Sequence, residues 1–281
     1  MFLKKGFVEI HIAVVLFGLA GLFGKWLELS PVIIVLGRVF FASIALGSIL
    51  ILSKQNLKKL PAKNTIILFF LGMLLAFHWI CFFRSIQVSF VAVGLLSYSS
   101  FPLFTAILEP IFFRTRIVLS NVCFAIFCIL GVFMIIPRFE LSNLIFQGVL
   151  WGLCAGLTFS ILTIMNRKLA QQYSYLQIAF YQDLSAFLCL FPFLFVLDAG
   201  LQVNHLFLLF LLGVFCTAAA HALFIKGLKH IKAQPAAIIS ALEPIYGIFF
   251  AVFLLQEIPS LRTILGGMII LSTVLASTVR K

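Results

Sequence analysis

Ten long runs of apolar residues follow one another along the chain, separated by short polar segments. A membrane-spanning helix needs about 20 consecutive apolar residues, and the runs have this length. A barrel strand would instead alternate apolar and polar residues. The pattern therefore predicts ten transmembrane helices, at residues 7–24, 31–52, 64–86, 88–113, 117–136, 145–166, 174–197, 206–227, 233–255 and 260–279.

The composition leads to the same class of protein. Of the 281 residues, 63% are hydrophobic and 10% are charged, whereas soluble domains are about half apolar and about a quarter charged. The chain lacks the polar residues for a water-facing shell, so we expect the lipid bilayer to surround it. A basic segment precedes the first run, as in a signal peptide. No typical cleavage site follows, so we interpret that run as a retained helix of an all-α integral membrane protein.

The basic residues predict the orientation in the membrane. The formal net charge of +12 would also suit a nucleic-acid-binding protein. With the N-terminus in the cytoplasm, however, fifteen of the twenty Lys and Arg residues fall in inner segments and four in outer ones, and Arg38 lies within a predicted helix. Basic residues concentrate in the cytoplasmic loops of membrane proteins. We therefore expect both termini in the cytoplasm, a location in the inner (plasma) membrane, and no nucleic-acid partner.

Sequence motifs for enzyme chemistry are missing. The chain contains no P-loop, no H-E-x-x-H and no G-x-S-x-G, so neither catalysis nor ATP-driven pumping by this chain alone is predicted. The six cysteines lie within apolar runs and lack metal-ligand spacing. We interpret them as small buried hydrophobic residues. The sequence thus predicts neither a cofactor nor a metal site.

An internal repeat relates the two halves of the chain. Sliding the sequence by 142 residues places Pro102 on Pro244, each after a run of small residues. The halves, residues 1–140 and 141–281, each hold five predicted helices. Since five is odd, the second half must enter the membrane from the opposite side, which gives the inverted repeat of many secondary transporters. Proline removes a backbone donor, so both prolines also predict helix breaks.

Polar residues within predicted spans are the candidates for function, because they are costly in a membrane and usually face a cavity or a partner. Glu243 lies near the middle of its helix, directly before Pro244. A carboxylate beside opened backbone can bind a cationic group or a proton, but it can also be a buried group that fixes helix packing. Ser97 and Tyr98 precede the break at Pro102, where hydroxyl groups either line the same cavity or join helices.

Two further sets of buried polar residues fall in helices that correspond in the repeat. His221 overlays Trp79, next to His78, so these residues either share a cavity or form ordinary interhelical hydrogen bonds. Arg38 and Asp183 occupy the second helix of each half. They are interpreted as an ion pair or a gate, with snorkelling of Arg38 to the membrane surface as the alternative.

The order and lengths of the segments resemble the EamA-type branch of the drug/metabolite transporter superfamily. The resemblance is carried by residues 22–46, 101–113 and 241–260, where a proline is followed thirteen residues later by Glu257. Thr115 departs from the pattern, because it matches Glu257 in the first half, where the family often has Glu. The resemblance implies a central cavity lined by helices 1, 3, 4, 6, 8 and 9, alternating access and, commonly, export of amino acids or other metabolites.

We therefore expect a secondary carrier that exports a small amphipathic metabolite such as an amino acid. The mechanistic hypothesis is that Glu243 alternates between a substrate ammonium group and a proton while the halves rock about Pro102 and Pro244. An uptake carrier or exchanger for a cofactor or nucleotide-like metabolite is an alternative, and so is a passive uniporter. A membrane scaffold or an intramembrane enzyme is a different class, which the lack of a catalytic motif disfavours.

Overall fold

The computed structural model describes residues 6–53, 59–114, 119–197 and 200–279, which form helices and no strands. The first half consists of α1 (Phe7–Trp26), α2 (Pro31–Leu52), α3 (Ala62–Val88), α4 (Val91–Tyr98), α5 (Phe101–Phe113) and α6 (Leu119–Ile135). The second half consists of α7 (Leu144–Leu169), α8 (Tyr175–Leu190), α9 (Val203–Gly213), α10 (Ala220–Leu228), α11 (Ala233–Ser240), α12 (Glu243–Phe250) and α13 (Leu261–Val279).

Each predicted run corresponds to one helical segment, and four of the segments are built from more than one piece. A 3₁₀ turn, Phe191–Phe195, extends α8, and π-helical segments lie at Val214–Ala219 and Ala251–Leu255. Seven of the described helical segments are long and apolar enough to cross a membrane, and three shorter apolar helices accompany them. Large apolar side chains are exposed along α2, α3, α6 and α12, as lipid-facing surfaces require. The predicted all-α membrane fold is confirmed.

The fourth and ninth segments are interrupted just before their prolines. α4 ends at Tyr98 and α5 begins at Phe101, while α11 ends at Ser240 and α12 begins at Glu243. Pro102 and Pro244 each lie in the first turn of the second piece, where the missing N–H costs no hydrogen bond. Broken backbone at membrane depth is tolerated inside a bundle if its polar groups find partners.

Serine hydroxyl groups supply those partners. Ser99 donates to the carbonyl of Leu95 at 2.9 Å, and Ser100 donates to the carbonyl of Ser97 at 2.8 Å. On the other side of the repeat, Ser240 donates to the carbonyl of Ala236 at 3.0 Å. These three serines therefore bond to backbone carbonyls rather than reach into a cavity.

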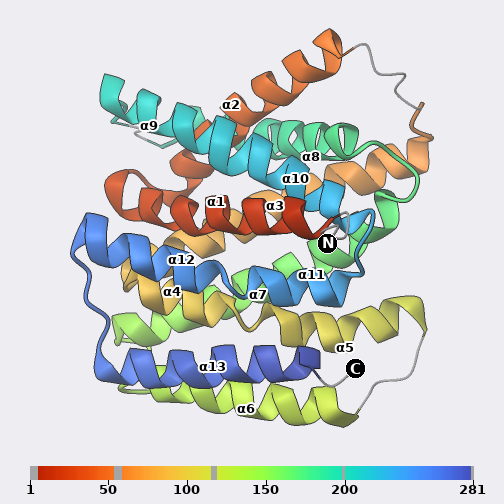
Figure 1. Ribbon diagram of the computed structural model, residues 1–281. Helices are drawn as coiled ribbons and strands as arrows, with labels where there is room; N and C mark the ends of the chain where they lie inside the picture. Colours follow the sequence, from red (N-terminus) through yellow and green to blue (C-terminus); the bar gives the residue numbers. More distant parts are fainter. Residues whose placement is uncertain (1–5, 54–58, 115–118, 198–199, 280–281) are drawn as a thin grey trace.

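The helix contacts of one half are repeated in the other. α1 packs on α10 and α12, and its counterpart α7 packs on α3 and α4. α2 packs on α8, and α6 packs on α13, so equivalent helices meet across the centre. In Figure 1, α4 and α5 run from left to right, whereas α11 and α12 run from right to left, and both chain ends lie at the right. The two halves thus have inverted topology.

Two glycines bring helix backbones together beside the buried charges. A Cβ atom on Gly72 of α3 would lie 2.5 Å from the carbonyl oxygen of Gln182 on α8. A Cβ atom on Gly213 of α9 would lie 2.8 Å from the carbonyl oxygen of Arg38 on α2. Real side chains cannot approach backbone so closely. Glycine at these crossings therefore fixes where α8 and α2 present Asp183 and Arg38.

Replacing Gly72 with alanine should destabilise the fold by about 1–3 kcal/mol, because the added methyl group overpacks a backbone contact. Gly21→Ala is the matched control, since its Cβ would have its nearest neighbour at an ordinary 3.6 Å. Thermal unfolding of the purified variants in detergent measures the difference. Equal melting temperatures for the two variants would show that α3 and α8 do not depend on this contact.

Candidate functional site

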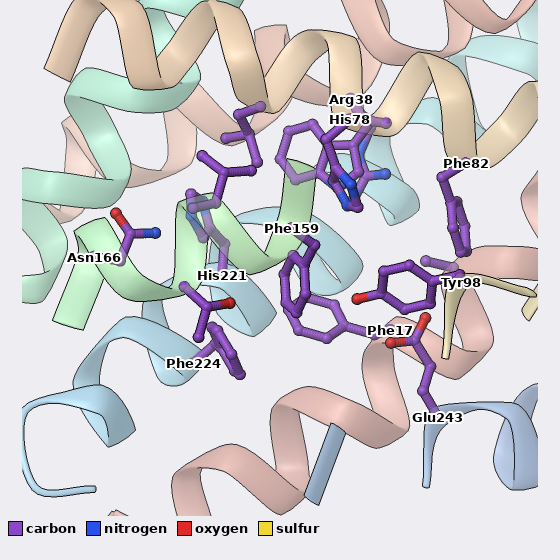
Figure 2. A pocket seen from close by; sticks show the side chains of 15 residues that line it. Phe17, Arg38, His78, Phe82, Tyr98, Phe159, Asn166, His221, Phe224 and Glu243 are labelled. Atoms are coloured by element: carbon purple, nitrogen blue, oxygen red, sulfur yellow. The ribbon is translucent and has the colours of Figure 1, made fainter. Parts of the chain in front are cut away.

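A cavity lies at the centre of the bundle, where α1, α2, α3, α4, α7, α10 and α12 converge. Its lining residues are Phe17, Ala20, Arg38, Leu75, His78, Trp79, Phe82, Tyr98, Phe159, Leu162, Thr163, Asn166, His221, Phe224 and Glu243. Figure 2 shows Asn166 and His221 toward one end and Tyr98 and Glu243 toward the other, around Phe159. The cavity therefore includes the helices that the family resemblance implies, and it adds Arg38 from α2.

The free space in this cavity is small, about 30 Å³. A buried water needs roughly 10–15 Å³ of such space, so the cavity has room for a few waters rather than for a metabolite. A substrate of the predicted kind would require the helices to separate.

The apolar wall of the cavity follows the repeat. Phe17 and Phe159 stand 142 residues apart, and so do Phe82 and Phe224. The ring of Phe159 contacts Phe17 with centroids 6.4 Å apart and Phe224 with centroids 5.3 Å apart. It also packs edge-on against Tyr98 at 5.5 Å. Aromatic faces on the pseudo-twofold axis offer both an apolar surface and a weak attraction for cations.

Arg38 is held inside the bundle by three contacts, with only 1% of its surface exposed. Its Nε donates to the hydroxyl of Thr217 at 2.9 Å, and one Nη donates to the carbonyl of Cys216 at 3.3 Å. The guanidinium carbon lies 3.9 Å from the ring centroid of Trp79. The side chain therefore points into the protein and not to the membrane surface.

The π-helical segment Val214–Ala219 makes two of these contacts available. A π turn is wider than an α turn and is often found at functional sites. Within it, Thr217 donates its hydroxyl proton to the carbonyl of Leu212 at 2.8 Å. That donation leaves the hydroxyl lone pairs free to accept from Arg38.

His78 is fixed by a carbonyl of the opposite half. Its Nδ1 lies 2.9 Å from the carbonyl oxygen of Ala155 on α7, and its ring stacks on Phe159 with centroids 5.2 Å apart. A carbonyl only accepts, so Nδ1 carries the proton in this contact. The Nδ1–H group is therefore bound to α7 and is not available to a ligand in the cavity.

Asp183 and His221 form a buried pair next to the cavity. His221 Nδ1 lies 3.5 Å from Asp183 Oδ1, with 6% and 0% of the two side chains exposed. Neither carboxylate oxygen has a hydrogen-bond partner among the described residues. His221 lines the cavity and Asp183 lies behind it, outside the lining. The carboxylate therefore meets the cavity only through the imidazole ring.

Glu243 is the second buried carboxylate, 2% exposed, at the first residue of α12. Its Oε2 atom has no hydrogen-bond partner in the described part of the chain. In Figure 2 the carboxylate lies on the side of the cavity formed by Tyr98 and Phe17. The positive end of the helix dipole favours a negative charge at this position. Glu243 is thus an acceptor that a ligand in the cavity can reach.

The structure brings five of the predicted binding residues together at the cavity: Glu243, His221, His78, Trp79 and Tyr98. Ser97, also predicted to bind substrate, is not among them. Its Cβ lies 2.6 Å from where a Cβ on Gly152 of α7 would stand. Successive helical residues point about 100° apart, so a helix that turns Tyr98 toward the cavity turns Ser97 away from it.

Among the described residues, Arg38 and Asp183 do not form the direct ion pair that was one of the two interpretations of the sequence, and their role as a gate stays a prediction. Arg38 bonds to Thr217 and Cys216, and Asp183 faces His221. The sequence interpretation also missed Phe17 and Phe159. Their spacing of 142 residues was the signal, because it puts two aromatic rings at equivalent positions of the repeat.

Polar contacts hold the bundle at both ends. At one end, Lys25 donates to the carbonyl of Ser89 at 2.8 Å and lies 3.8 Å from Glu257. Glu257 also accepts from the backbone N–H of Val91 at 2.9 Å. Arg167 is the repeat equivalent of Lys25, and at the opposite end it donates to the carbonyl of Lys229 at 3.1 Å. Thr115, the residue matched to Glu257, lies outside the described residues.

A second contact at the Arg167 end is ionic. Lys226 Nζ lies 3.3 Å from Oε1 of Glu9. The other carboxylate oxygen of Glu9 accepts from the backbone N–H of Gly6 at 2.9 Å. These groups are partly exposed, so the pair contributes little to stability. It can nevertheless set which end of the bundle is closed.

Comparison with known proteins gives one family. The EamA-like transporter family matches residues 4–136 and, separately, residues 146–279. An uncharacterized transporter of Bacillus subtilis, YxxF, is 24% identical over 279 residues, which covers 98% of this chain and 89% of the relative. An S-adenosylmethionine uptake transporter of Rickettsia conorii is 26% identical over 241 residues, covering 85% and 79% of the two chains. A solved crystal structure has the same fold, with a TM-score of 0.73 at 14% identity over 98% of this chain and 99% of that one.

Thr217→Val should destabilise the protein by about 1–3 kcal/mol, because it leaves a charged donor of Arg38 buried without an acceptor. Thr273→Val on α13 is the matched control, a buried threonine away from Arg38. Thermal unfolding in detergent compares the two. If both variants lose the same stability, the Thr217 hydroxyl is not what holds the guanidinium.

Proposed function

The chain belongs to the EamA-like transporter family, and we propose that it is a secondary carrier that moves a small amphipathic metabolite, such as an amino acid, by alternating access through the central cavity. The two halves, residues 1–140 and 141–281, would rock about the helix breaks at Pro102 and Pro244. The proposal assigns no catalytic step and no cofactor. The observation that carries the proposal is Glu243, which lines a cavity with a largely aromatic wall and has a carboxylate oxygen without a hydrogen-bond partner among the described residues.

The balance of buried charge favours a substrate with a net positive charge. Among the described residues, the buried side chains with a formal charge are Arg38, Asp183 and Glu243. If both carboxylates are ionised, the core holds one positive and two negative charges. An uncompensated charge in a dry interior costs several kcal/mol. One further positive charge is therefore needed, and either a proton or a cationic substrate can supply it.

This requirement gives a simple exchange. A substrate cation that binds at Glu243 replaces a proton in the charge balance of the buried core, and a proton that returns to the core on the other side drives the substrate out. The aromatic wall around Phe159 suits the apolar body of such a substrate, and it attracts a cationic group as well. Export coupled to proton entry follows from a core that holds one additional positive charge at a time.

We place the carrier in the inner (plasma) membrane with both termini in the cytoplasm. The support is the positive-inside rule, because fifteen of the twenty Lys and Arg residues fall in the segments that lie on the same side of the membrane as the N-terminus. The Lys25–Glu257 contact then closes the outer end, and the Lys226–Glu9 and Arg167 contacts close the inner end. Alternating access requires each set of contacts to break in turn.

Uptake of S-adenosylmethionine is a second candidate. The relative from Rickettsia conorii is named for this substrate. S-adenosylmethionine carries a sulfonium, an ammonium and a carboxylate, so its net charge is positive, and its adenine ring can stack on the aromatic wall. Counterflow of labelled S-adenosylmethionine into preloaded proteoliposomes decides between the candidates, with unlabelled arginine and lysine as competitors.

Glu243→Gln should lower proton-driven accumulation in proteoliposomes by about 10- to 100-fold, because it removes a charged hydrogen-bond acceptor for the substrate cation. The control is Glu140→Gln, an exposed carboxylate between α6 and α7. The transported probe is selected first by a thermal-shift screen, in which a bound metabolite raises the melting temperature.

An unchanged rate and pH dependence in Glu243→Gln would remove this residue from the mechanism. Accumulation by the unmodified protein must also collapse when a protonophore is added. A flux that never exceeds the substrate gradient would identify a passive uniporter instead.

Glu257→Ala should loosen the outer end. Its loss frees the N–H of Val91 and the ammonium of Lys25, so amide exchange at the start of α4 should rise several-fold, up to about 10-fold. Hydrogen–deuterium exchange followed by mass spectrometry reports this change. The segment around Lys229 at the inner end serves as the internal control, and an equal rise there would mean general destabilisation rather than opening of one end.

A further inference from the structure

The pair of Asp183 and His221 is a second buried ionisable site, and the exchange at Glu243 does not use it. The two residues come from α8 and α10, and the facing atoms lie 3.5 Å apart. Neither oxygen of Asp183 has a hydrogen-bond donor among the residues described. A buried carboxylate without hydrogen-bond donors is costly. A proton shared between Asp183 and His221 would supply the missing hydrogen bond.

One proton beyond the deprotonated form makes the pair neutral, whichever atom carries that proton. A proton on the imidazole gives an ion pair, and a proton on the carboxyl gives a neutral pair, and both forms have the same net charge. Because the two groups face each other inside the protein, the proton is assigned to the pair rather than to either residue. Uptake of one proton changes the charge of the pair from −1 to zero.

The helices packed around the pair contribute one charged group and several polar or aromatic ones. From α2, Arg38 faces it, and the fields of Asp183 and Glu243 both reach that guanidinium. From α3, Trp79 lies edge-on to His221 with centroids 6.0 Å apart, while His78 is turned to Ala155.

The remaining neighbours are uncharged. Cys216 of the π-helical segment presents its carbonyl to Arg38. On α8 itself, Gln182 donates to Asn166 of α7 at 2.6 Å. In the buried part of the structure that is described, Arg38 is therefore the permanent cation, and the two buried carboxylates, Asp183 and Glu243, both lie close enough to act on its charge.

We propose that the Asp183–His221 pair binds the coupling proton, at a site separate from the carboxylate that meets the substrate. This inference rests on the proposed carrier function. Without substrate, Glu243 balances Arg38, and the pair is neutral because it holds the proton. When a cation occupies Glu243, Asp183 becomes the counter-ion of Arg38, and the proton leaves the pair. The core thus stays neutral in both states.

The position of His221 provides the route for this proton. The ring lines the cavity, whereas Asp183 does not. On release, the N–H bond of the ring breaks and the proton passes to water in the cavity, while both bonding electrons stay on nitrogen. Uptake reverses this step. Chains of aspartate, glutamate and histidine residues serve as proton relays in membrane proteins. With the proton on this pair and the substrate at Glu243, the two never compete for the same atoms.

Nuclear magnetic resonance of ¹⁵N-histidine-labelled protein in lipid nanodiscs tests the site without any substrate. On acidification, His221 should change to the imidazolium form, or infrared spectroscopy should show a protonated carboxyl that Asp183→Asn removes. His78, which has no ion-pair partner among the described residues, serves as the internal reference and should not respond to Asp183→Asn. In Asp183→Asn the His221 titration should disappear, and in Glu243→Gln it should persist.

A pair that takes up no proton in the unmodified protein overturns the inference, and so does a His221 titration that Asp183→Asn leaves unchanged. The measurement on the unmodified protein decides the first point even if the variant does not fold. A failure of the carrier function would not alter either spectrum, so the two failures are distinguishable.

Transport then tests the coupling role. Proteoliposomes are given labelled arginine, lysine and S-adenosylmethionine, each with a net positive charge. Asp183→Asn should weaken counterflow at equal pH, because Arg38 loses its counter-ion in the substrate-bound state, and it should abolish accumulation driven by a pH gradient. Glu243→Gln should lose both activities. If Asp183→Asn still accumulates substrate along the pH gradient, the proton is held elsewhere. If the unmodified protein moves none of the three probes, the proposed substrate class fails, and the spectra alone decide the proton site.

Discussion

Keeping a small number of charges neutral inside a lipid-surrounded bundle is the constraint on which this structure depends. Arg38 is buried between helices of both halves, and the widened turn around Thr217 and Cys216 gives it two acceptors. Gly72 and Gly213 allow the neighbouring helix backbones to approach closely, and this close packing positions Asp183 and Arg38. With two carboxylates and one guanidinium in the core, the protein is balanced only when one additional positive charge is present. The transport cycle proposed above follows from that single requirement.

The repeat explains the shape of the cavity, and departures from the repeat explain its chemistry. Phe17 and Phe159, like Phe82 and Phe224, are equivalent pairs that form an aromatic wall on the pseudo-twofold axis. The polar residues break this symmetry, because Glu243 is matched by an aromatic residue in the first half and His221 is matched by Trp79. The same holds at the crossing of α1 and α12, where a Cβ on Gly18 would lie 3.0 Å from the backbone nitrogen of Gly247. The equivalent crossing of α5 and α7 is instead joined by a hydrogen bond of 3.0 Å between Thr105 and Ser160.

The sequence was sufficient for the helices and for much of the cavity, because lipid leaves the backbone few alternatives. Apolar runs located the ten segments, and Pro102 and Pro244 located the two interruptions. Helix rotation was not accessible in this way, since apolar residues cover most of each helix and give no clear face. Ser97 was therefore assigned to the cavity although it packs on α7, and Asp183 was matched with Arg38 although it faces His221. The π-helical turn that receives Arg38 left no pattern in the sequence that we could interpret.

The central claim is that a cation and a proton replace one another in the buried core. Isothermal titration calorimetry of the purified protein with arginine or S-adenosylmethionine, repeated in buffers of different ionisation enthalpy, counts the protons released on binding. The account predicts the release of about one proton for each cation bound, because only one extra positive charge can be neutralised inside. Binding of either cation with no proton released would contradict it.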